Sequence, residues 1–379
     1  MRIGVNTLFL IPGKVGGSET YLRHVLAELV ALDETHKVVL FCNRENAGTF
    51  PQTTRPNVTE VPCRVHATSR PRRILFEQKA LPKLVKRHGI EVLWSPGYTA
   101  PLRLACPSVV STLDMQCMHY PKDFAWMARR AMRFFVPRAA RKAAAVLTLS
   151  EHSKRDIVRF CRVPAARVHV TPLAADENAG GDIPEDEQQA TLKRFGLDEP
   201  YILTVANAWP HKNVPALVRA HARLPEDCAR RLVIVGIHGR GMAEVNAAIA
   251  ASPRGDRIVI VADWLSEREL WTLYRHAALF AFPSLFEGFG LPVLEAMAAG
   301  VPVVSSNAAS LPEVYGDAAL AFDPTDEAAM ADAIRRVLED EALARDLVER
   351  GRRNVARFSW RRTAEKTLDV LKEAATRRA

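Results

Sequence analysis

The chain has 379 residues, 48% of them hydrophobic and 25% charged, which is typical of a globular protein of about two domains. No apolar run is long enough to cross a bilayer, and the six cysteines show neither a CxxC pair nor metal-ligand spacing. The first residues, 1–17, have the pattern of a strand rather than of a signal peptide. These features predict a cytoplasmic protein with reduced cysteines that fill its cores.

Charge is distributed unevenly along the chain. Residues 1–178 contain 27 Lys and Arg against 14 Asp and Glu, whereas residues 179–379 contain 25 against 29. A basic first half favours an anionic partner, which a membrane surface, a phosphorylated acceptor or nucleic acid would each provide. No zinc-finger spacing, basic-zipper heptads or RNA-binding aromatic signature occurs in the sequence, so we expect no nucleic acid partner.

The first half alternates short apolar runs with helical patterns. We expect strands at 3–8, 38–42, 91–94, 107–112, 144–149 and 167–170, and helices at 18–32, 74–88, 122–142 and from Ser150. Strands that are apolar throughout and separated by helices indicate a parallel sheet that is covered on both faces. The first half is therefore predicted to be a doubly wound α/β domain.

Residues 173–187 are small and polar, without periodicity, and predict an interdomain linker. The alternation then resumes, with strands expected at 200–205, 231–236, 257–261, 278–282 and 302–305, helices at 212–223, 241–251 and 266–276, a further helix from Leu291, and a helical end. We expect domains at 1–174 and 175–358, followed by a C-terminal helix at 359–379.

The segment 282–300 combines the features of a ligand site. Glu287 and Glu295 flank a glycine turn, 288–290, that leads from the strand into a helix. The free N–H groups of a first helical turn favour a phosphate, and carboxylates suit the hydroxyls of a sugar or ribose. A ligand with both groups is predicted. The alternative is that Glu295 only complements the helix dipole and Glu287 is a solvated loop charge.

Two other turns of the second half follow strands. In 207–213, Lys212 is placed to neutralise a pyrophosphate, with His211 assisting when protonated. The glycine-rich turn 236–241 is a weaker candidate for a phosphate contact, because such turns are common after strands. The alternative for Lys212 is an ordinary exposed lysine.

The first half offers its own candidates. The turn 13–17 follows the first strand and could bind phosphate or acceptor through its backbone, or be a plain turn with Ser18 as helix N-cap. It matches neither a P-loop nor a GxGxxG fingerprint. Asp114 and His119 lie just past a strand, and His119 is either a site residue or a structural histidine.

The basic amphipathic stretch 124–142 mixes Phe, Trp and Met with six cationic side chains. Such a helix can lie on an anionic membrane surface. The alternative is a core helix with a solvated basic face, because helices of α/β domains carry the same apolar stripe.

With these residues in place, the chain resembles the family 4 retaining glycosyltransferases of the GT-B fold over nearly its full length. The strongest match is 282–300, with its Glu, seven residues, Glu spacing. Further matches are GGSETY from Gly16, VLTLSEHSKRDI from Val146, Lys212-Asn213, LPEVYGDAA from Leu311 and the closing FSW. The resemblance implies two Rossmann-like domains facing across a cleft, with C-terminal helices packing back toward the first domain.

The resemblance also implies residue roles. Lys212 would bind the donor diphosphate, Glu295 the ribose, and Glu287 the transferred sugar. The implied donor-binding residues are Gly16, Gly17, Asn207, His211, Lys212, Gly236, Gly288, Phe289, Gly290, Leu291 and Glu295, and the catalytic candidates are Glu287, Asp114 and His119. The family is metal-independent, and with no Asp-x-Asp pair in the chain we expect neither a metal nor a cofactor besides the donor.

Two positions depart from the family pattern. His211-Lys212 stands where the family usually has Arg-Lys, which removes a permanent charge and predicts pH-dependent donor binding. Leu113-Asp114 stands where many members have His-Asp. That His119 substitutes for the missing histidine is a hypothesis.

The resemblance implies transfer of a hexose, with retention, to a glycan or polyprenyl-diphosphate-linked acceptor at the inner membrane surface. The residue pattern of the 282–298 motif, together with MHYP from Met118, resembles that of bacterial mannosyl- or rhamnosyltransferases. It favours mannose from GDP-mannose as the donor, in bacterial surface polysaccharide synthesis. The alternatives are a soluble-acceptor GT-B transferase or epimerase, and a nucleotide-sugar-binding protein without activity.

Overall fold

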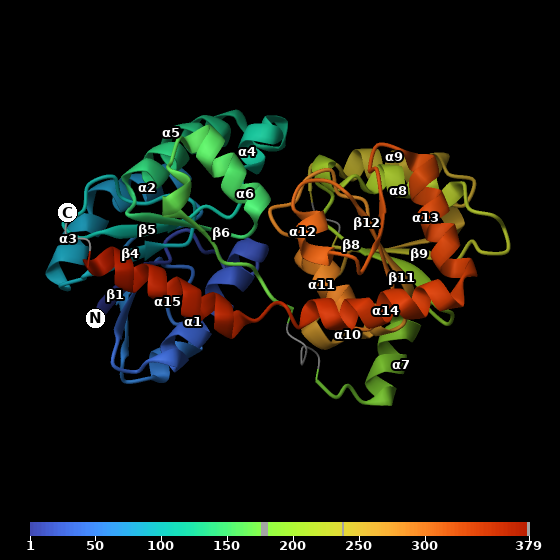
Figure 1. The fold of residues 1–379 in the computed structure, drawn as a ribbon, viewed down its shortest axis with the longest axis horizontal. Coiled ribbons are helices and arrows are strands. Elements are labelled where there is room, and N and C mark those ends of the chain that lie inside the picture. The colour runs from blue at the N-terminus through green and yellow to red at the C-terminus, as the bar shows by residue number, and fades with distance from the viewer. Residues whose placement is uncertain (176–180, 237–238, 377–379) are drawn as a thin grey trace. The chain divides into compact units, whose positions relative to one another are not determined.

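The structure is a computed structural model that describes residues 1–175, 181–236 and 239–376. The chain divides into two compact units, Met1–Leu173 with Ser359–Ala379, and Ala174–Phe358 (Figure 1). The middle of the expected linker, 176–180, and His238 of the turn 236–241 lie outside the described residues.

The described part of unit 1 is built on a seven-stranded parallel sheet with strand order β3-β2-β1-β4-β5-β6-β7. Its strands are β1 Arg2–Asn6, β2 Lys37–Cys42, β3 Val58–Pro62, β4 Val92–Ser95, β5 Ser108–Ser111, β6 Ala145–Thr148 and β7 Val168–Val170. The winding reverses between β1 and β4. Ligands of open α/β sheets bind beyond the carboxyl ends of the strands at such a reversal.

Helices cover both faces of this sheet (Figure 1). They are α1 Gly17–Leu32, α2 Arg70–Lys79, α3 Leu81–Arg87, α4 Gln116–His119, α5 Trp126–Lys142, α6 Glu151–Asp156 and α15 Trp360–Thr376, with short turns η1 Pro51–Thr54, η2 Pro121–Asp123, η3 Ile157–Cys161 and η4 Ala165–Arg167. The last helix, α15, packs along α1 and over β4, β5 and β6. Trp360 stacks on His24 of α1 with ring centroids 4.6 Å apart. The expected return of the C-terminal helix to the first domain is confirmed.

Unit 2 repeats the plan with a six-stranded parallel sheet among its described residues, in the order β10-β9-β8-β11-β12-β13. Its strands are β8 Tyr201–Val205, β9 Leu232–Val235, β10 Ile258–Val261, β11 Ala277–Phe282, β12 Val303–Ser306 and β13 Leu320–Phe322. Here the winding reverses between β8 and β11, so the loops that follow these two strands are the expected place for a ligand.

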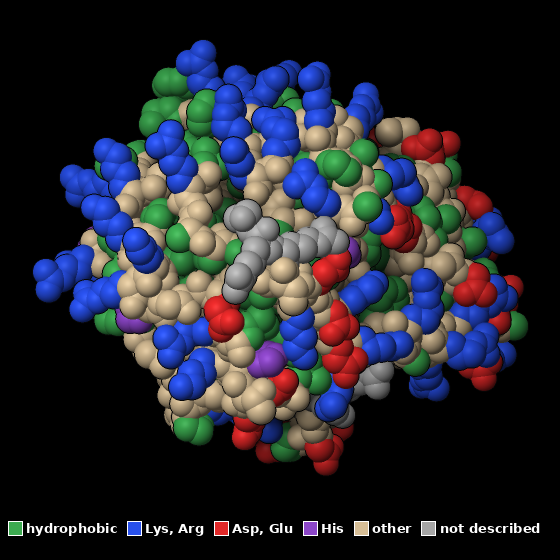
Figure 2. All heavy atoms as spheres, turned by 60° about the vertical axis from the view of Figure 1, so that its left-hand side comes forward, with side chains coloured by type: hydrophobic (Ala, Val, Ile, Leu, Met, Phe, Trp, Pro, Cys, Tyr) green, Lys and Arg blue, Asp and Glu red, His purple; other side chains and the backbone are tan. Residues whose placement is uncertain are grey.

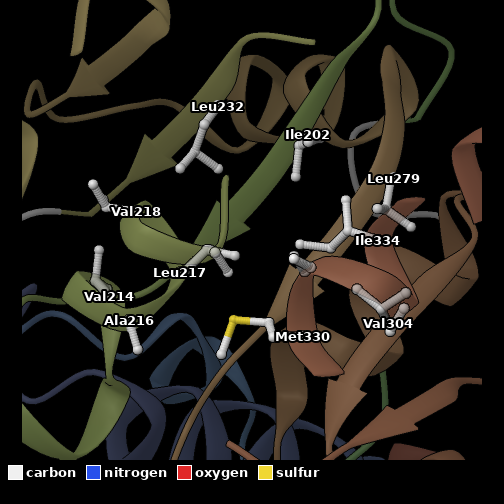
Figure 3. Close-up of a cluster of buried hydrophobic side chains, with 14 of the residues drawn as sticks. Ile202, Val214, Ala216, Leu217, Val218, Leu232, Leu279, Val304, Met330 and Ile334 are labelled. Carbon is white, nitrogen blue, oxygen red and sulfur yellow. The ribbon is translucent and has the colours of Figure 1, made fainter. Parts of the chain in front are cut away.

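The helices of unit 2 are α7 Glu185–Arg194, α8 Val214–Ala222, α9 Met242–Ala251, α10 Glu267–Arg275, α11 Leu291–Ala298, α12 Leu311–Tyr315, α13 Glu327–Glu339 and α14 Glu341–Val355, with η5 Pro210–Lys212 and η6 Gly255–Arg257. One core cluster joins α8 and α13 to the sheet, through buried side chains that include Leu217, Ile202, Leu279 and Ile334 (Figure 3). On the other face α11 packs against α10 and α14. Apolar side chains on both faces explain why these strands are apolar throughout.

The prediction of two doubly wound α/β domains is confirmed, with local corrections. Strands β3 and β13 were not expected, because their exposed, mixed sequences lack a strong apolar run. The helix expected at 74–88 is two helices, α2 and α3, since Pro82 opens a new helix at its first turn. Helix α7 begins inside the segment expected to be linker. No helix in the described residues is long and apolar enough to span a membrane.

Candidate functional site

The loops after β8 and β11 meet at the winding reversal of unit 2. The backbone N–H of Leu285 donates to the carbonyl of His211 at 2.7 Å. This bond ties the two loops together at the sheet edge where the topology places a ligand. The loops carry Lys212 and Glu287, two residues that the sequence singled out separately.

Lys212 and Glu287 form an ion pair, with Nζ 2.6 Å from Oε1. Their side chains are only 19% and 11% exposed, so water screens the pair less than it screens a surface pair. The ammonium also lies 5.6 Å from the centre of the Phe282 ring. The pair places a cation and an anion directly beside the glycine turn. Lys212 can there interact with an anionic ligand as well as with Glu287.

The glycine turn is fixed by its neighbours. Gly290 has φ 113°, and a Cβ there would stand 2.6 Å from Cδ2 of Leu311, so only glycine fits. The hydroxyl of Ser310 lies 2.9 Å from the carbonyl oxygens of both Glu287 and Phe289. Because the carbonyls are held on this side, the shape of the turn is set before any ligand arrives.

Three backbone amides at the end of this turn and the start of α11 face no acceptor among the described residues: those of Phe289, Gly290 and Leu291. These groups precede or begin α11, whose dipole favours negative charge at this end. Three such amides with a nearby lysine are suited to bind phosphate oxygens.

Glu295 lies one turn into α11, and its Oε2 accepts a hydrogen bond of 2.8 Å from the hydroxyl of Tyr274. Burial raises the pKa of Glu295; the Tyr274 hydrogen bond lowers it and the charge of Glu267 raises it further. No described residue donates a hydrogen bond to Oε1 of Glu295. This oxygen can therefore accept one from a ligand hydroxyl.

The remaining candidates of unit 2 border these loops. Gly236, with φ 93°, ends β9, and a Cβ there would lie 3.6 Å from Oδ1 of Asn207. Asn207 itself is exposed. His211 is only 5% exposed, so its ring is packed into the loop, although the sequence suggested a group that faces the ligand. Whether these residues touch a donor remains a prediction.

In unit 1, Gly16 is the N-cap of α1, with φ 54°, and Gly17 is the first helical residue. The alternative in which Ser18 caps this helix is wrong, because the helix begins one residue earlier. A Cβ at either glycine would meet no atom within 4 Å. The backbone at this helix start is thus approachable within unit 1.

Asp114 follows β5, and both of its oxygens accept hydrogen bonds. The backbone N–H of Gln116 donates to Oδ1 at 3.0 Å, and the hydroxyl of Tyr98 donates to Oδ2 at 3.1 Å. Tyr98 holds a left-handed backbone, with φ 66°, which is rare for a residue with a side chain. Leu113, at the position of the family histidine, is 3% exposed and belongs to the core.

His119 lies on α4 and pairs with α6. Its Nε2 is 2.6 Å from Oδ2 of Asp156, and His152 approaches the same carboxylate at 3.9 Å. The ring of His119 also packs edge-on against Phe160. The structure therefore gives His119 a packing role within unit 1 and leaves its catalytic role as a prediction. Among the residues described, no group of three His, Cys, Asp or Glu side chains is arranged to hold a metal ion.

Three residues that support the site were given no role from the sequence, although Asn213 was part of the Lys212-Asn213 match. Asn213, in the left-handed conformation at φ 58°, donates from Nδ2 to the carbonyls of Pro283 and Pro324, at 3.2 and 2.8 Å. Asn after a lysine in a turn was a usable signal, because Asn tolerates this conformation. Ser310 and Tyr274 gave no signal, since each acts on a partner that is distant in the sequence.

Comparison with known proteins agrees with this geometry. A sequence model described as "Glycosyltransferase Family 4" matches residues 15–179, and one described as "Glycosyl transferases group 1" matches residues 186–354. The second match contains every candidate of unit 2, and the first contains those of unit 1.

Solved structures share the fold. A sucrose-phosphate synthase from Thermosynechococcus elongatus superimposes with a TM-score of 0.77 at 20% identity, covering 98% of both chains. HepE of Anabaena in complex with UDP-glucose gives 0.74 at 19% identity, covering 98% of this chain and 100% of that one. Two doubly wound sheets of this kind define the class of GT-B glycosyltransferases. Within that class, the chain belongs to the glycosyltransferases of family 4, with a group 1 second half.

Several curated relatives are bacterial mannosyltransferases. O-antigen chain mannosyltransferase B of Escherichia coli is 33% identical over 67% of this chain and 66% of its own length. O-antigen chain mannosyltransferase RfbU of Salmonella typhimurium is 26% identical over 92% and 94%. Serotype-specific mannosyltransferase WbdA of E. coli is 31% identical over 60% of this chain. That match takes in 28% of WbdA, so the chain spans about a quarter of this longer relative.

Proposed function

We propose that the chain transfers a hexose from a nucleotide diphosphate sugar to a glycan or polyprenyl-diphosphate-linked acceptor in bacterial surface polysaccharide synthesis. Mannose from GDP-mannose is the favoured donor. The names of the mannosyltransferase relatives support the sugar and the pathway. Anomeric retention is carried over from the family resemblance.

The observation that carries this proposal is the assembly at the winding reversal of unit 2. Lys212, the amides of the glycine turn and Glu295 offer a cation, hydrogen-bond donors and a carboxylate within one pair of loops. A diphosphate needs the first two, and a ribose needs the third. Glu287, beside Lys212, is then the carboxylate available to the sugar.

In the reaction, the bond between the sugar and the diphosphate breaks, and negative charge grows on the leaving diphosphate. Lys212 and the amides at the start of α11 stabilise that charge, as fixed donors do at developing oxyanions. We propose that they do so without a metal ion. Asp114 is the candidate on the acceptor side, held by Tyr98 and the Gln116 amide.

The direct test is transfer from GDP-mannose to a polyprenyl-diphosphate-linked glycan, followed by NMR of the product, with UDP-glucose as the competing donor and EDTA present in a parallel reaction. The expected product keeps the anomeric configuration of the donor and forms equally with EDTA. A product with inverted anomeric configuration would contradict the proposal that the transfer is retaining. Donor binding without transfer or hydrolysis would favour the alternative of a non-catalytic nucleotide-sugar-binding protein.

The acceptor proposal includes attachment to the inner face of the membrane through α5. Three large apolar side chains of this helix are exposed: Trp126 at 62%, Met127 at 56% and Phe134 at 47%. The exposed cations on the same helix are Arg130, Arg133, Arg138, Arg141 and Lys142. No acidic residue occurs from 124 to 150. Figure 2 shows Lys and Arg side chains with hydrophobic ones among them over the upper left of the molecule.

This combination matches an anionic bilayer, which takes apolar side chains between its headgroups and attracts the arginines around them. The test is co-sedimentation with vesicles that contain phosphatidylglycerol, compared with phosphatidylcholine alone. We expect R130E/R133E/R138E to lose binding to the anionic vesicles and to keep transfer to a water-soluble acceptor analogue. The matched control reverses three exposed charges of unit 2, R336E/R345E/R353E. Equal binding to both vesicle types, or transfer only to soluble acceptors, would favour the soluble-acceptor alternative.

A further inference from the structure

Tyr274 is the one described side chain that donates a hydrogen bond to Glu295. Its ring is fully buried and packs against Trp271 and Phe280, with ring centroids 5.9 and 5.6 Å away. A tyrosine packed on two aromatic rings cannot readily swing its hydroxyl away from the carboxylate. The hydrogen bond of 2.8 Å is thus held from the tyrosine side.

The helix that carries Tyr274 is itself anchored. Helix α10 begins with a capping box, in which Ser266 and Glu269 exchange side-chain and backbone hydrogen bonds. The hydroxyl of Tyr201, on β8, donates to the carbonyl of Leu273 at 2.8 Å and so fastens α10 to the sheet. Tyr274 therefore acts from a rigid element, which favours precise placement of the group that it contacts.

Glu295 needs this support because its surroundings work against its charge. Burial raises the pKa of the carboxyl, and Glu267 at the start of α10 adds a like charge. In the described residues, no Lys, Arg or His forms an ion pair with it. The Tyr274 hydroxyl lowers the pKa and so favours the carboxylate, the form that accepts hydrogen bonds from two hydroxyls at once.

We infer that Tyr274 is a positioning residue for ribose recognition: it orients Glu295 through Oε2 and leaves Oε1 to accept a hydrogen bond from a hydroxyl of the nucleoside. This inference rests on the proposed function, in which Glu295 takes the ribose of the donor. It adds that the preference of the site for ribonucleotides depends on a tyrosine that does not itself touch the ligand.

The experiment measures the affinity of GDP and of 2′,3′-dideoxy-GDP for the wild type, Tyr274→Phe and Tyr201→Phe by calorimetry. Tyr201→Phe is the matched control, because it removes a buried tyrosine hydroxyl bonded to the residue next to Tyr274. We expect Tyr274→Phe to weaken GDP binding by about 10- to 100-fold, the effect of one hydrogen bond to a charged group, and to leave dideoxy-GDP binding unchanged. Tyr201→Phe should keep the wild-type ratio between the two ligands.

A pH series gives a second readout. GDP affinity should fall as the pH drops through the pKa of Glu295, and in Tyr274→Phe this fall should begin at higher pH, because the hydroxyl that lowers the pKa is gone. Equal losses for GDP and dideoxy-GDP in Tyr274→Phe, or wild-type affinity for both, would overturn the inference alone. A wild type that binds neither GDP nor UDP would overturn the proposed function and this inference with it.

Discussion

The two units share one winding but place different chemistry at its reversal. In unit 2 the loops after β8 and β11 bring together Lys212, Glu287 and the backbone amides of Phe289 to Leu291. In unit 1 the reversal lies between β1 and β4, and the groups near it include glycine backbone, Asp114 with Tyr98, and the buried Glu77, which accepts hydrogen bonds from Asn6 and Thr99. The same fold thus carries a lysine–glutamate ion pair in one unit and carboxylates held by hydroxyl and amide donors in the other.

The units agree in one respect. Asp114 accepts a hydrogen bond from the partly buried Tyr98, and Glu295 accepts one from the buried Tyr274. The pKa of both tyrosines is raised well above the usual value, first by burial and then by the neighbouring carboxylate, so each remains a donor. The Lys212–Glu287 ion pair therefore characterises the loops of unit 2, while a carboxylate held by a tyrosine is common to both units.

The largest effect is expected where that charge pairing is removed. Lys212→Met should lower kcat/KM for transfer by about 100- to 1000-fold, the usual cost of losing a fixed group that stabilises developing negative charge. Arg219→Met is the control, because Arg219 forms an ion pair with Glu327 of α13 and is 51% exposed. Steady-state kinetics that show equal losses in both variants would mean that Lys212 has no special role.

Substitutions in unit 1 should lower activity less than Lys212→Met does. They also distinguish its two catalytic candidates, Asp114 and His119. We expect Asp114→Asn to lower kcat by about 100-fold, within the range for a positioned acid–base group. His119→Ala should cost about 10-fold at most, because His119 is engaged by Asp156 and packs on Phe160. The reverse ranking at saturating substrate would make His119 the substitute for the family histidine. Full activity of His119→Ala would remove it from the catalytic candidates.

Paired glycine substitutions compare the backbones of the two units. Gly290→Ala should destabilise the fold by about 1 to 3 kcal/mol and weaken donor binding, because the backbone is left-handed and Leu311 occupies the space of the new Cβ. Gly17→Ala should leave stability unchanged or slightly raised, since α1 gains a better helix former and the new Cβ meets no atom. Thermal unfolding tests both. If transfer falls in Gly17→Ala although stability holds, a substrate approaches that helix start.

The smallest expected effect is a pH-dependent gain in stability from Glu295→Gln. Because burial raises the folded-state pKa of Glu295 above its unfolded value, the folded state binds the proton more tightly. Wild-type stability therefore falls as the pH rises through the interval between those two pKa values. The variant has no proton to lose there, so it should be more stable than the wild type above that interval and similar below it. Thermal unfolding of both proteins across pH checks this expectation. A difference in stability between Glu295→Gln and the wild type that does not change with pH would contradict the burial of this charge.

The sequence predicted the layers of the fold because fully apolar strands separated by helices have few other solutions. It located Lys212 and Glu287 separately, but their ion pair depends on the strand order, which places β8 beside β11. It also missed helix α7, which begins in the expected linker, because its polar helical residues have no apolar run to mark them.

The residues that position the site, Tyr274 and Ser310, could not be predicted from the sequence for a related reason. Tyr274 and Ser310 look like ordinary core residues of a helix and a loop, and each acts on a partner set by tertiary packing. The burial of His211 was not foreseen, because a histidine beside a lysine in a turn gives no sign that its ring is packed, and its contact with a donor stays a prediction. Motif spacing identifies candidate ligand-binding residues more readily than it identifies the residues that position them.

The most direct test of the central claim, that unit 2 holds the nucleotide sugar through Lys212, is thermal unfolding with and without saturating GDP-mannose. A ligand that binds only the folded state raises the apparent Tm. We predict the same rise for the wild type and His119→Ala, and little or none for Lys212→Met. A rise in Lys212→Met equal to that of the wild type, or a rise lost in His119→Ala instead, would contradict the account.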